Sequence, residues 1–266
     1  MKKRFLVFFT LLFVSLAVHQ QANAYGVTGH RVVAEIAQRN LSKKTLKGLQ
    51  ELIGKQALAF WSNWPDFIKS DTTHAFDEVS VWHYVDVSGH LQAAPFVDSL
   101  KALKGKNLYT QIPAMMATIQ NKNLPLIQRQ QALYLLIHFV GDLHQPLHVG
   151  RDEDAGGNKI NVMWFDKKTN LHSVWDSELV NFQQYSYTEY ASVLNIASKS
   201  EIATMQSGSL DDWFYESHVL SDKIYDATPD GSKLGYKYNF IFARELDNQL
   251  LKGGLRLAKL LNEVFE

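Results

Sequence analysis

One segment constrains the fold more than any other. Residues 126–143 are rich in apolar side chains, and Pro146 follows shortly after. Because proline has no backbone N–H and restricts the residue before it, we expect a long helix that ends there. This apolar helix also carries His138 and Asp142, which lie four residues apart and therefore share a face. Either these groups are polar decoration near a helix end, or they hold something charged.

The rest of the chain favours helices as well. Residues 30–39 carry apolar side chains at helical spacing, and residues 243–265 read as a leucine-rich amphipathic helix in which the glycine pair 253–254 is a candidate bend. Ser42 is expected to cap a helix that Gly54 ends. No repeat or long linker divides the chain. We therefore expect a mainly α fold in a single helical domain.

Strand signals are sparse. Residues 159–165 (KINVMWF) alternate moderately between apolar and polar side chains, and residues 166–170 (DKKTN) resemble a turn. The pattern predicts at most a small β-hairpin.

The first residues have the pattern of a leader. Three basic residues at positions 2–4 precede an apolar run over 5–18 and the small-residue pattern Ala22-Asn23-Ala24. This predicts a signal peptide over 1–24 that is cleaved before Tyr25, leaving a soluble catalytic domain over 25–266 that is secreted or periplasmic. The apolar run is short for a membrane-spanning helix.

Charge and cysteine content narrow the functional classes. Removing three of the 27 basic residues and no acidic ones leaves a formal charge of −3, which gives no footprint for long duplex nucleic acid. The chain has no cysteine. An exported protein without disulfides needs a good core, bound metal, or both.

Histidine and aspartate recur at a spacing suited to metal ligands. His172 and Asp176 repeat the separation of His138 and Asp142, and His148 follows Pro146, where a loop could return it to the same centre. Imidazole nitrogen and carboxylate oxygen are donors that Zn²⁺ accepts. A single such pair is more often a surface hydrogen bond, whereas two pairs favour a metal site.

Other histidines differ in what their positions allow. His83 lies in the aromatic and β-branched stretch VWHYVDV, which could present it inward. His144 is about 240° around an ideal helix from His138, so we expect a supporting or surface role for it. Cleavage before Tyr25 would free an α-amine whose nitrogen, together with the Tyr25 carbonyl and His30, could bind a metal ion.

Five ordered elements resemble those of the zinc-dependent S1/P1 nuclease family. The resemblance is highly specific from Tyr25 to Asp176, and the last ninety residues offer only a compatible helical pattern. The family begins with an aromatic residue, a glycine and a histidine at the sixth position, and its later motifs match WPDFIK, WHYVD, IHFVGDLHQPLH, and GGNKINV with NLHSVWD. In this chain these elements are Tyr25-Gly26 with His30, residues 64–69, residues 82–86, residues 137–148, and residues 156–162 with 170–176.

This resemblance implies a helical fold shared with zinc phospholipase C and three Zn²⁺ per chain. Carried over by position, the ligands of the first zinc would be Asp66, His83, His138 and Asp142. Those of the second would be His148, His172 and Asp176. Those of the third would be the Tyr25 amine and carbonyl, His30 and Asp142, so that Asp142 bridges two ions.

The resemblance also implies the reaction. A zinc-bound hydroxide would cleave single-stranded RNA and DNA, and also 3′-mononucleotides, leaving 5′-phosphate and 3′-hydroxyl ends. Asp66 and Lys69 match the catalytic positions, with Lys69 beside the scissile phosphate. Tyr84 matches an aromatic residue on which a base stacks, and Asp86 a carboxylate at the base edge. Without the motif, Lys69 would read as a solvated lysine and Tyr84 as core packing.

Two departures from the family pattern stand out. The usual first residue is tryptophan rather than Tyr25, and fungal and plant members carry disulfides, whereas this chain has no cysteine. The chain reads more like a bacterial member. We expect a monomer without stable membrane association.

Two alternative functions remain open at this point. A zinc phospholipase C would use the same scaffold, and an aromatic residue beside a carboxylate could also receive a choline ammonium. A helical protein that binds zinc only for folding is the other alternative.

Overall fold

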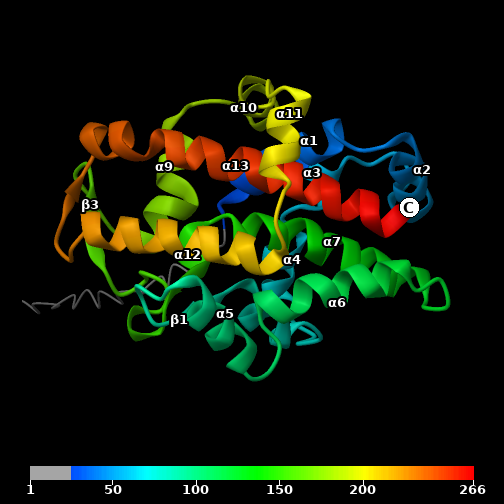
Figure 1. Ribbon diagram of the computed structural model, residues 1–266, viewed down its shortest axis with the longest axis horizontal. Helices are drawn as coiled ribbons and strands as arrows, with labels where there is room; N and C mark the ends of the chain where they lie inside the picture. Colours follow the sequence, from blue (N-terminus) through cyan, green and yellow to red (C-terminus); the bar gives the residue numbers. More distant parts are fainter. Residues whose placement is uncertain (1–24) are drawn as a thin grey trace, which may run out of the picture.

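The computed structural model describes residues 25–266 (Figure 1). The expected leader, residues 1–24, lies outside the described residues. Helices dominate the fold, and the strands form two small sheets, which confirms the mainly α prediction. Among residues 25–266, no helix combines the length and apolar character needed to cross a bilayer.

The elements follow one another in a long helical series. The helices are α1 (Val27–Arg39), α2 (Lys43–Ile53), α3 (Leu58–Trp61), α4 (Trp64–Phe67), α5 (Ala93–Ala102), α6 (Leu108–Gln120), α7 (Leu126–Leu143), α8 (Leu171–Ser173), α9 (Leu179–Phe182), α10 (Tyr187–Leu194), α11 (Lys199–Met205), α12 (Leu210–Ala227) and α13 (Tyr236–Phe265). Short 3₁₀ turns relevant to the site are η1 (Ile68–Ser70), η2 (Asp77–His83) and η3 (Pro146–His148), and η5 (Val174–Glu178) is a π-helical turn. The strands are β1 (Val85–Val87), β2 (Val149–Arg151), β3 (Asn161–Trp164), β4 (Lys167–Asn170) and β5 (Lys233–Leu234).

Helix α7 forms the centre of the core. Every residue from Ala132 to Leu143 is buried, which explains why the segment is apolar on nearly all sides. The helix ends at Leu143, as the sequence predicts from the nearby Pro146. Helices α1, α6 and α13 pack against it, and α13 spans most of the length of the molecule (Figure 1).

Helix α13 does not break at its glycine pair. It begins at Tyr236, seven residues before the predicted start, and continues through Gly253 and Gly254. A Cβ on Gly254 would lie 2.5 Å from the Ile36 side chain, so the glycine permits close approach to α1. The glycine pair therefore allows α13 to pack closely against α1, and the predicted bend at these glycines is wrong.

Local signals at α2 act as the sequence predicts. The Ser42 side chain accepts a hydrogen bond from the Thr45 N–H, and Gly54 ends the helix with a positive φ of 64°. Glycine adopts this left-handed conformation without the Cβ clash of other residues.

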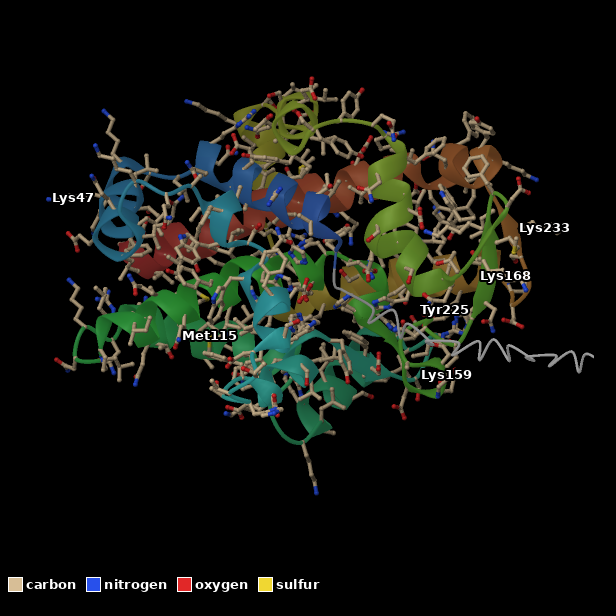
Figure 2. The ribbon with its side chains drawn as sticks, turned by 180° about the vertical axis from the view of Figure 1, so that it is seen from behind. Lys47, Met115, Lys159, Lys168, Tyr225 and Lys233 are labelled. Atoms are coloured by element: carbon tan, nitrogen blue, oxygen red, sulfur yellow. The ribbon has the colours of Figure 1, made fainter. Side chains whose placement is uncertain are left out.

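The strands differ in detail from the predicted hairpin. Residues 167–170 are strand β4, paired antiparallel with β3, so the turn expected over 166–170 is confined to Phe165 and Asp166. Strand β5 adds to the other edge of β3, and Lys168 and Lys233 of this sheet lie at one end of the molecule (Figure 2). Pairing between segments distant in sequence determines where these strands form, and local residue propensities indicate such pairing only weakly.

A second, parallel strand pair links two parts of the candidate site. Val85 of β1 pairs with Val149 of β2. These strands follow directly after the segments that carry His83 and His148, so the pairing holds the two histidines together. Tyr225 of α12, labelled in Figure 2, supports this region because its hydroxyl donates to the Asp154 carboxylate.

Candidate metal centre

Three groups of histidine and aspartate side chains converge at the inner face of α7. Within each group the donor atoms lie within 4.8 Å of one another. The groups are His30, Asp66 and His138; His83, His138 and Asp142; and His148, His172 and Asp176. The structure thus brings together every histidine and aspartate that the family resemblance implies as a ligand.

Backbone carbonyls fix the orientation of three imidazoles. Nδ1 of His138 lies 2.7 Å from the Ser62 carbonyl oxygen, Nδ1 of His148 lies 2.7 Å from that of His83, and Nδ1 of His172 lies 2.6 Å from that of Gly156. A ring that donates from Nδ1 to a carbonyl keeps Nε2 free to accept a metal. This hydrogen-bond pattern is typical of metal-ligating histidines.

Asp142 lies between the groups. Its Oδ1 is 3.3 Å from His30 Nε2 and 3.8 Å from His148 Nδ1, and its Oδ2 is 2.9 Å from His83 Nδ1 and 3.5 Å from His138 Nε2. The carboxylate is fully buried. Its two oxygens therefore face different imidazoles, which is the arrangement that a bridging ligand needs.

Glycine makes the approach of His30 possible. His30 is on α1 and Asp142 on α7, and a Cβ on Gly141 would lie only 2.5 Å from His30 Nδ1. Any larger residue at 141 would force the two helices or the imidazole apart.

The electrostatics of the cluster suit a cation. Burial lowers the pKa of His30 and of His83 well below the usual value, and it lowers the pKa of His138 to about 4, so these imidazoles are neutral donors at pH 7. Burial raises the pKa of Asp142 well above its usual range. The ionised carboxylate is thus unfavourable without a nearby positive charge.

In the group of His148, His172 and Asp176, the side chains interact strongly with one another. Burial alone would raise the pKa of Asp176, but interactions with His172 and His148 outweigh it and bring the pKa to about 2. The same pairing outweighs burial at His172 and raises its pKa. His172 and Asp176 lie four residues apart across α8 and η5, with Nε2 3.2 Å from Oδ2.

Gln145 supports this group, and sequence reasoning did not assign it a role. It is fully buried, its amide donates to Asp176 Oδ1, and its Oε1 accepts the Leu147 N–H at 2.6 Å. The signal available in the sequence was its place in the QPLH element, between two histidines.

Tyr25 is positioned beside the centre. Its ring is fully buried at an edge-to-face angle to His30, with the ring centroids 6.2 Å apart, and its hydroxyl donates to the His144 carbonyl at 2.8 Å. A Cβ on Gly26 would lie 2.4 Å from Ser177 Oγ. Gly26 therefore permits close packing next to Asp176.

His144 does not join the metal groups. It is fully buried, so the predicted surface position is wrong, and the supporting role stays a prediction. Its Nδ1 lies 2.8 Å from the Val140 carbonyl oxygen, and its Nε2 lies 3.1 Å from an Arg256 guanidinium nitrogen. This links the end of α7 to α13 beneath Tyr25.

A small cleft of about 190 Å³ opens onto the cluster. His83, His148 and His172 line it, together with the three residues predicted to contact substrate, Lys69, Tyr84 and Asp86. Lys69 Nζ lies 2.7 Å from Asp66 Oδ1. Tyr84 is 40% exposed.

The surroundings of Asp86 differ from those of the aspartates in the three metal groups. Its Oδ1 is buried without a hydrogen-bond partner among the described residues, and burial raises its pKa to about 7. The cleft thus presents one aromatic face, one cation and one carboxyl group whose charge changes near neutral pH.

Unpaired polar atoms show that the cluster is fitted to bind metal. Buried side-chain nitrogens and oxygens without a hydrogen-bond partner are rare in proteins and costly. In residues 25–266 such atoms include both ring nitrogens of His30, Nε2 of His83 and of His148, Oδ1 of Asp142 and Oδ2 of Asp176. Nitrogen and oxygen donors without sulfur are compatible with zinc.

Comparisons with known proteins identify the family of this chain. A family model described as S1/P1 nuclease matches residues 25–266. Endonuclease 4 of Arabidopsis thaliana is 29% identical over 92% of this chain and 90% of its own length, and nuclease P1 of Penicillium citrinum is 27% identical over 90% of this chain and 97% of its own.

Two further comparisons cover less. Nuclease S1 of Aspergillus oryzae is 28% identical over 62% of this chain and 58% of its own length. Among solved structures, the alpha toxin from Clostridium absonum aligns with a TM-score of 0.44 and 16% identity, over 92% of this chain and 66% of its own. Because the family model spans every residue that the structure describes, the chain belongs to the S1/P1 nuclease family.

Proposed function

We propose that this protein is a zinc-dependent nuclease that hydrolyses single-stranded RNA and DNA, and also 3′-mononucleotides, to leave 5′-phosphate and 3′-hydroxyl ends. The observation that carries the proposal is the buried cluster of imidazoles and carboxylates beneath a cleft with Lys69, Tyr84 and Asp86. Membership of the S1/P1 nuclease family supports it.

We infer three zinc ions from the family resemblance, with a division of ligands that differs from the geometric groups in placing His30 with Asp142 and not with Asp66 and His138. Asp66, His83, His138 and Asp142 would hold one, and His148, His172 and Asp176 a second. The Tyr25 amine and carbonyl, His30 and Asp142 would hold the third. The position of Asp142 between His30 and His83 supports the shared ligand. Bound zinc would supply Lewis acidity and lower the pKa of water toward neutrality.

Lys69 would bind the scissile phosphate. It lies at the cleft beside Asp66, and its ammonium can stabilise negative charge that develops on the phosphoryl oxygens. Its partner Asp66 keeps the long side chain pointed at the cluster. We therefore assign catalytic roles to both residues, with Lys69 binding the phosphate and Asp66 orienting Lys69.

Tyr84 and Asp86 would hold the base next to that phosphate. An exposed aromatic face stacks on any base, whereas the Asp86 carboxyl can hydrogen-bond to polar groups at the base edge. A cleft of about 190 Å³ has room for a single base, and a base can enter it only after leaving a duplex. We therefore expect the enzyme to prefer single strands.

Export completes the proposal. The predicted leader supports a secreted or periplasmic enzyme that starts at Tyr25. We also propose that the enzyme works as a monomer without stable membrane association. The intact mass of chain recovered from periplasm and medium, and its elution in size-exclusion chromatography, would check each part.

The decisive experiment compares substrates. Protein starting at Tyr25 and loaded with zinc is incubated with single-stranded RNA, single-stranded DNA and phosphatidylcholine, with and without a chelator. Chelator-sensitive cleavage of the nucleic acids to 5′-phosphate ends is the expected result. Hydrolysis of phosphatidylcholine alone would replace the nuclease with a phospholipase C.

A variant separates catalysis from metal binding. Lys69→Met should lower kcat by about 10²–10³-fold, as loss of one transition-state donor does, with unchanged zinc content. Lys168→Met removes an exposed lysine on β4 and serves as the matched control, with full activity expected. A fully active Lys69→Met variant would overturn the role of Lys69, and zinc binding without turnover on any phosphoester would favour a purely structural metal site.

A further inference from the structure

A second, larger cavity lies beside the metal centre. It is a groove of about 920 Å³ between α2, the α3–η1 segment and α7. We call it the aromatic groove and define it by six of its lining residues, Trp61, Trp64, Phe67, Phe76, Ile127 and Tyr134.

The floor of the aromatic groove is a set of packed rings. Trp61 stacks on Tyr134 with the ring centroids 4.0 Å apart and the planes 7° from parallel. Trp64 meets Tyr134 edge-on at 5.3 Å and Phe76 at 5.4 Å. Phe67 differs, because it is 58% exposed and pairs with no other ring in residues 25–266. The groove therefore offers one aromatic face at its rim.

The aromatic groove is continuous with the candidate active site through one short segment. Within the 3₁₀ turn η1, Lys69 lines the catalytic cleft, whereas its neighbours Ile68 and Ser70 line the groove. Likewise Asp66 belongs to a metal group, and the next residue, Phe67, belongs to the groove. The two cavities thus lie on opposite sides of the same turn.

Helix α7 provides a second connection. Ile127, Gln131, Tyr134, His138 and Asp142 follow at spacings of three and four and form one stripe along the helix. The first three line the groove, and the last two belong to the metal groups. Tyr134 precedes His138 by one turn, a rise of about 6 Å.

The chemistry of the aromatic groove suits a base better than a phosphate. Its lining contains apolar and aromatic side chains with a few amides and hydroxyls and the carboxylate of Asp71, and no lysine or arginine of residues 25–266 is among them. The nearest cation on the shared turn, Lys69, faces the catalytic cleft. A strand whose phosphate is held at Lys69 could therefore extend over the turn and place a neighbouring base in the groove.

We propose, on the basis of the proposed function, that the aromatic groove binds a second nucleobase of the single-stranded substrate, stacked on Phe67 across the η1 turn from the scissile phosphate. The enzyme would then favour longer strands over dinucleotides, since only longer strands fill both cavities.

The test compares kcat/KM for a hexanucleotide with kcat/KM for a dinucleotide, using zinc-loaded protein. Loss of stacking on one base corresponds to about 5- to 140-fold. Phe67→Ala should lower the hexanucleotide-to-dinucleotide ratio by that factor. Phe240→Ala removes a ring that is 87% exposed on α13 and outside the groove, and its ratio should match that of the wild type.

A second variant places a negative charge in the aromatic groove. Ile127, which is 56% exposed on α7, is replaced by glutamate, whose carboxylate would repel the incoming strand. Val193→Glu makes the same change at a 48% exposed position on α10 outside the groove. Ile127→Glu should lower the ratio, and Val193→Glu should not.

The outcomes separate the two proposals. Unchanged ratios in both groove variants, with cleavage intact, would overturn the groove and leave the nuclease standing. If the wild type cleaves neither substrate, the proposed nuclease activity is wrong. Binding of the hexanucleotide, monitored by tryptophan fluorescence, then tests whether the aromatic groove holds a base. Binding that is unaffected by Phe67→Ala would overturn it in that case.

Discussion

Asp142→Asn tests the proposed bridging role of the most buried carboxylate in the cluster. Asp142 places Oδ1 3.3 Å from His30 Nε2 and Oδ2 2.9 Å from His83 Nδ1. Asparagine fills nearly the same volume but offers a single acceptor oxygen and no negative charge. If Asp142 bridges two zinc ions, the variant should lose both and keep only the ion held by the group around His148.

The size of the effect follows from linkage. A ligand present at 100 times its Kd stabilises the folded state by about 2.7 kcal/mol, so loss of two bound ions removes about 5 kcal/mol. In a chain of this size each kcal/mol shifts Tm by about 2–4 °C, which gives a fall of about 10–20 °C for the zinc-loaded variant.

The metal-free protein should respond in the opposite direction. Because burial raises the pKa of Asp142 well above its usual range, the ionised carboxylate is unfavourable in the absence of zinc. A neutral amide of the same shape avoids that cost, so metal-free Asp142→Asn should be at least as stable as the metal-free wild type.

Native mass spectrometry and thermal melts with and without zinc measure both effects. Asp86→Asn changes a carboxyl that lines the neighbouring cleft and belongs to no metal group, and we expect it to retain all three ions. Three zinc ions in Asp142→Asn would refute the bridge. An equal loss of Tm with and without zinc would show instead that Asp142 serves packing alone.

Three further predictions concern the surroundings of the centre. Burial and the neighbouring Arg256 guanidinium hold the pKa of His144 well below its usual value, so the unfolded chain binds a proton below about pH 6.5 that the folded protein does not. The free energy of unfolding therefore falls as the pH falls below 6.5, by about 1.4 kcal/mol per pH unit for this proton. In urea unfolding between pH 7 and 5, His144→Gln should lack this contribution to the pH dependence. An equal pH dependence in wild type and variant would contradict the assignment. Two residues retained ahead of Tyr25 should remove one zinc ion and lower activity, whereas a fully active extended chain would exclude the α-amine as a ligand. Gln145→Leu removes the amide that donates to Asp176 and should weaken zinc binding by about 10- to 100-fold in competition with a chelator, and an unchanged affinity would reduce Gln145 to a packing role.

Much of the helical framework could be predicted from local pattern. The limits of α7, the Ser42 cap and the Gly54 stop follow from side-chain chemistry within a few residues of each position. The sequence predicts a turn over residues 166–170 because they carry no apolar alternation, whereas residues 167–170 form strand β4 through their pairing with β3. The parallel pair of Val85 with Val149 is equally invisible in sequence, since the partners are distant along the chain.

The sequence by itself determined which side chains have metal-binding chemistry. The repeated spacing of histidine and aspartate and the order of the family motifs named every member of the three metal groups, because ligand type and helical periodicity are local properties. The structure places these side chains together, and their roles as ligands stay a prediction until zinc is measured.

Only the tertiary structure decided how these side chains meet. The approach of His30 to Asp142 depends on the packing of α1 against α7 at Gly141, and the burial of His144 depends on Arg256 from the far end of the chain. The aromatic groove likewise unites residues between 52 and 76 with residues between 127 and 134. Distances, burial and pKa shifts arise from contacts between such remote segments, and a linear pattern does not contain them.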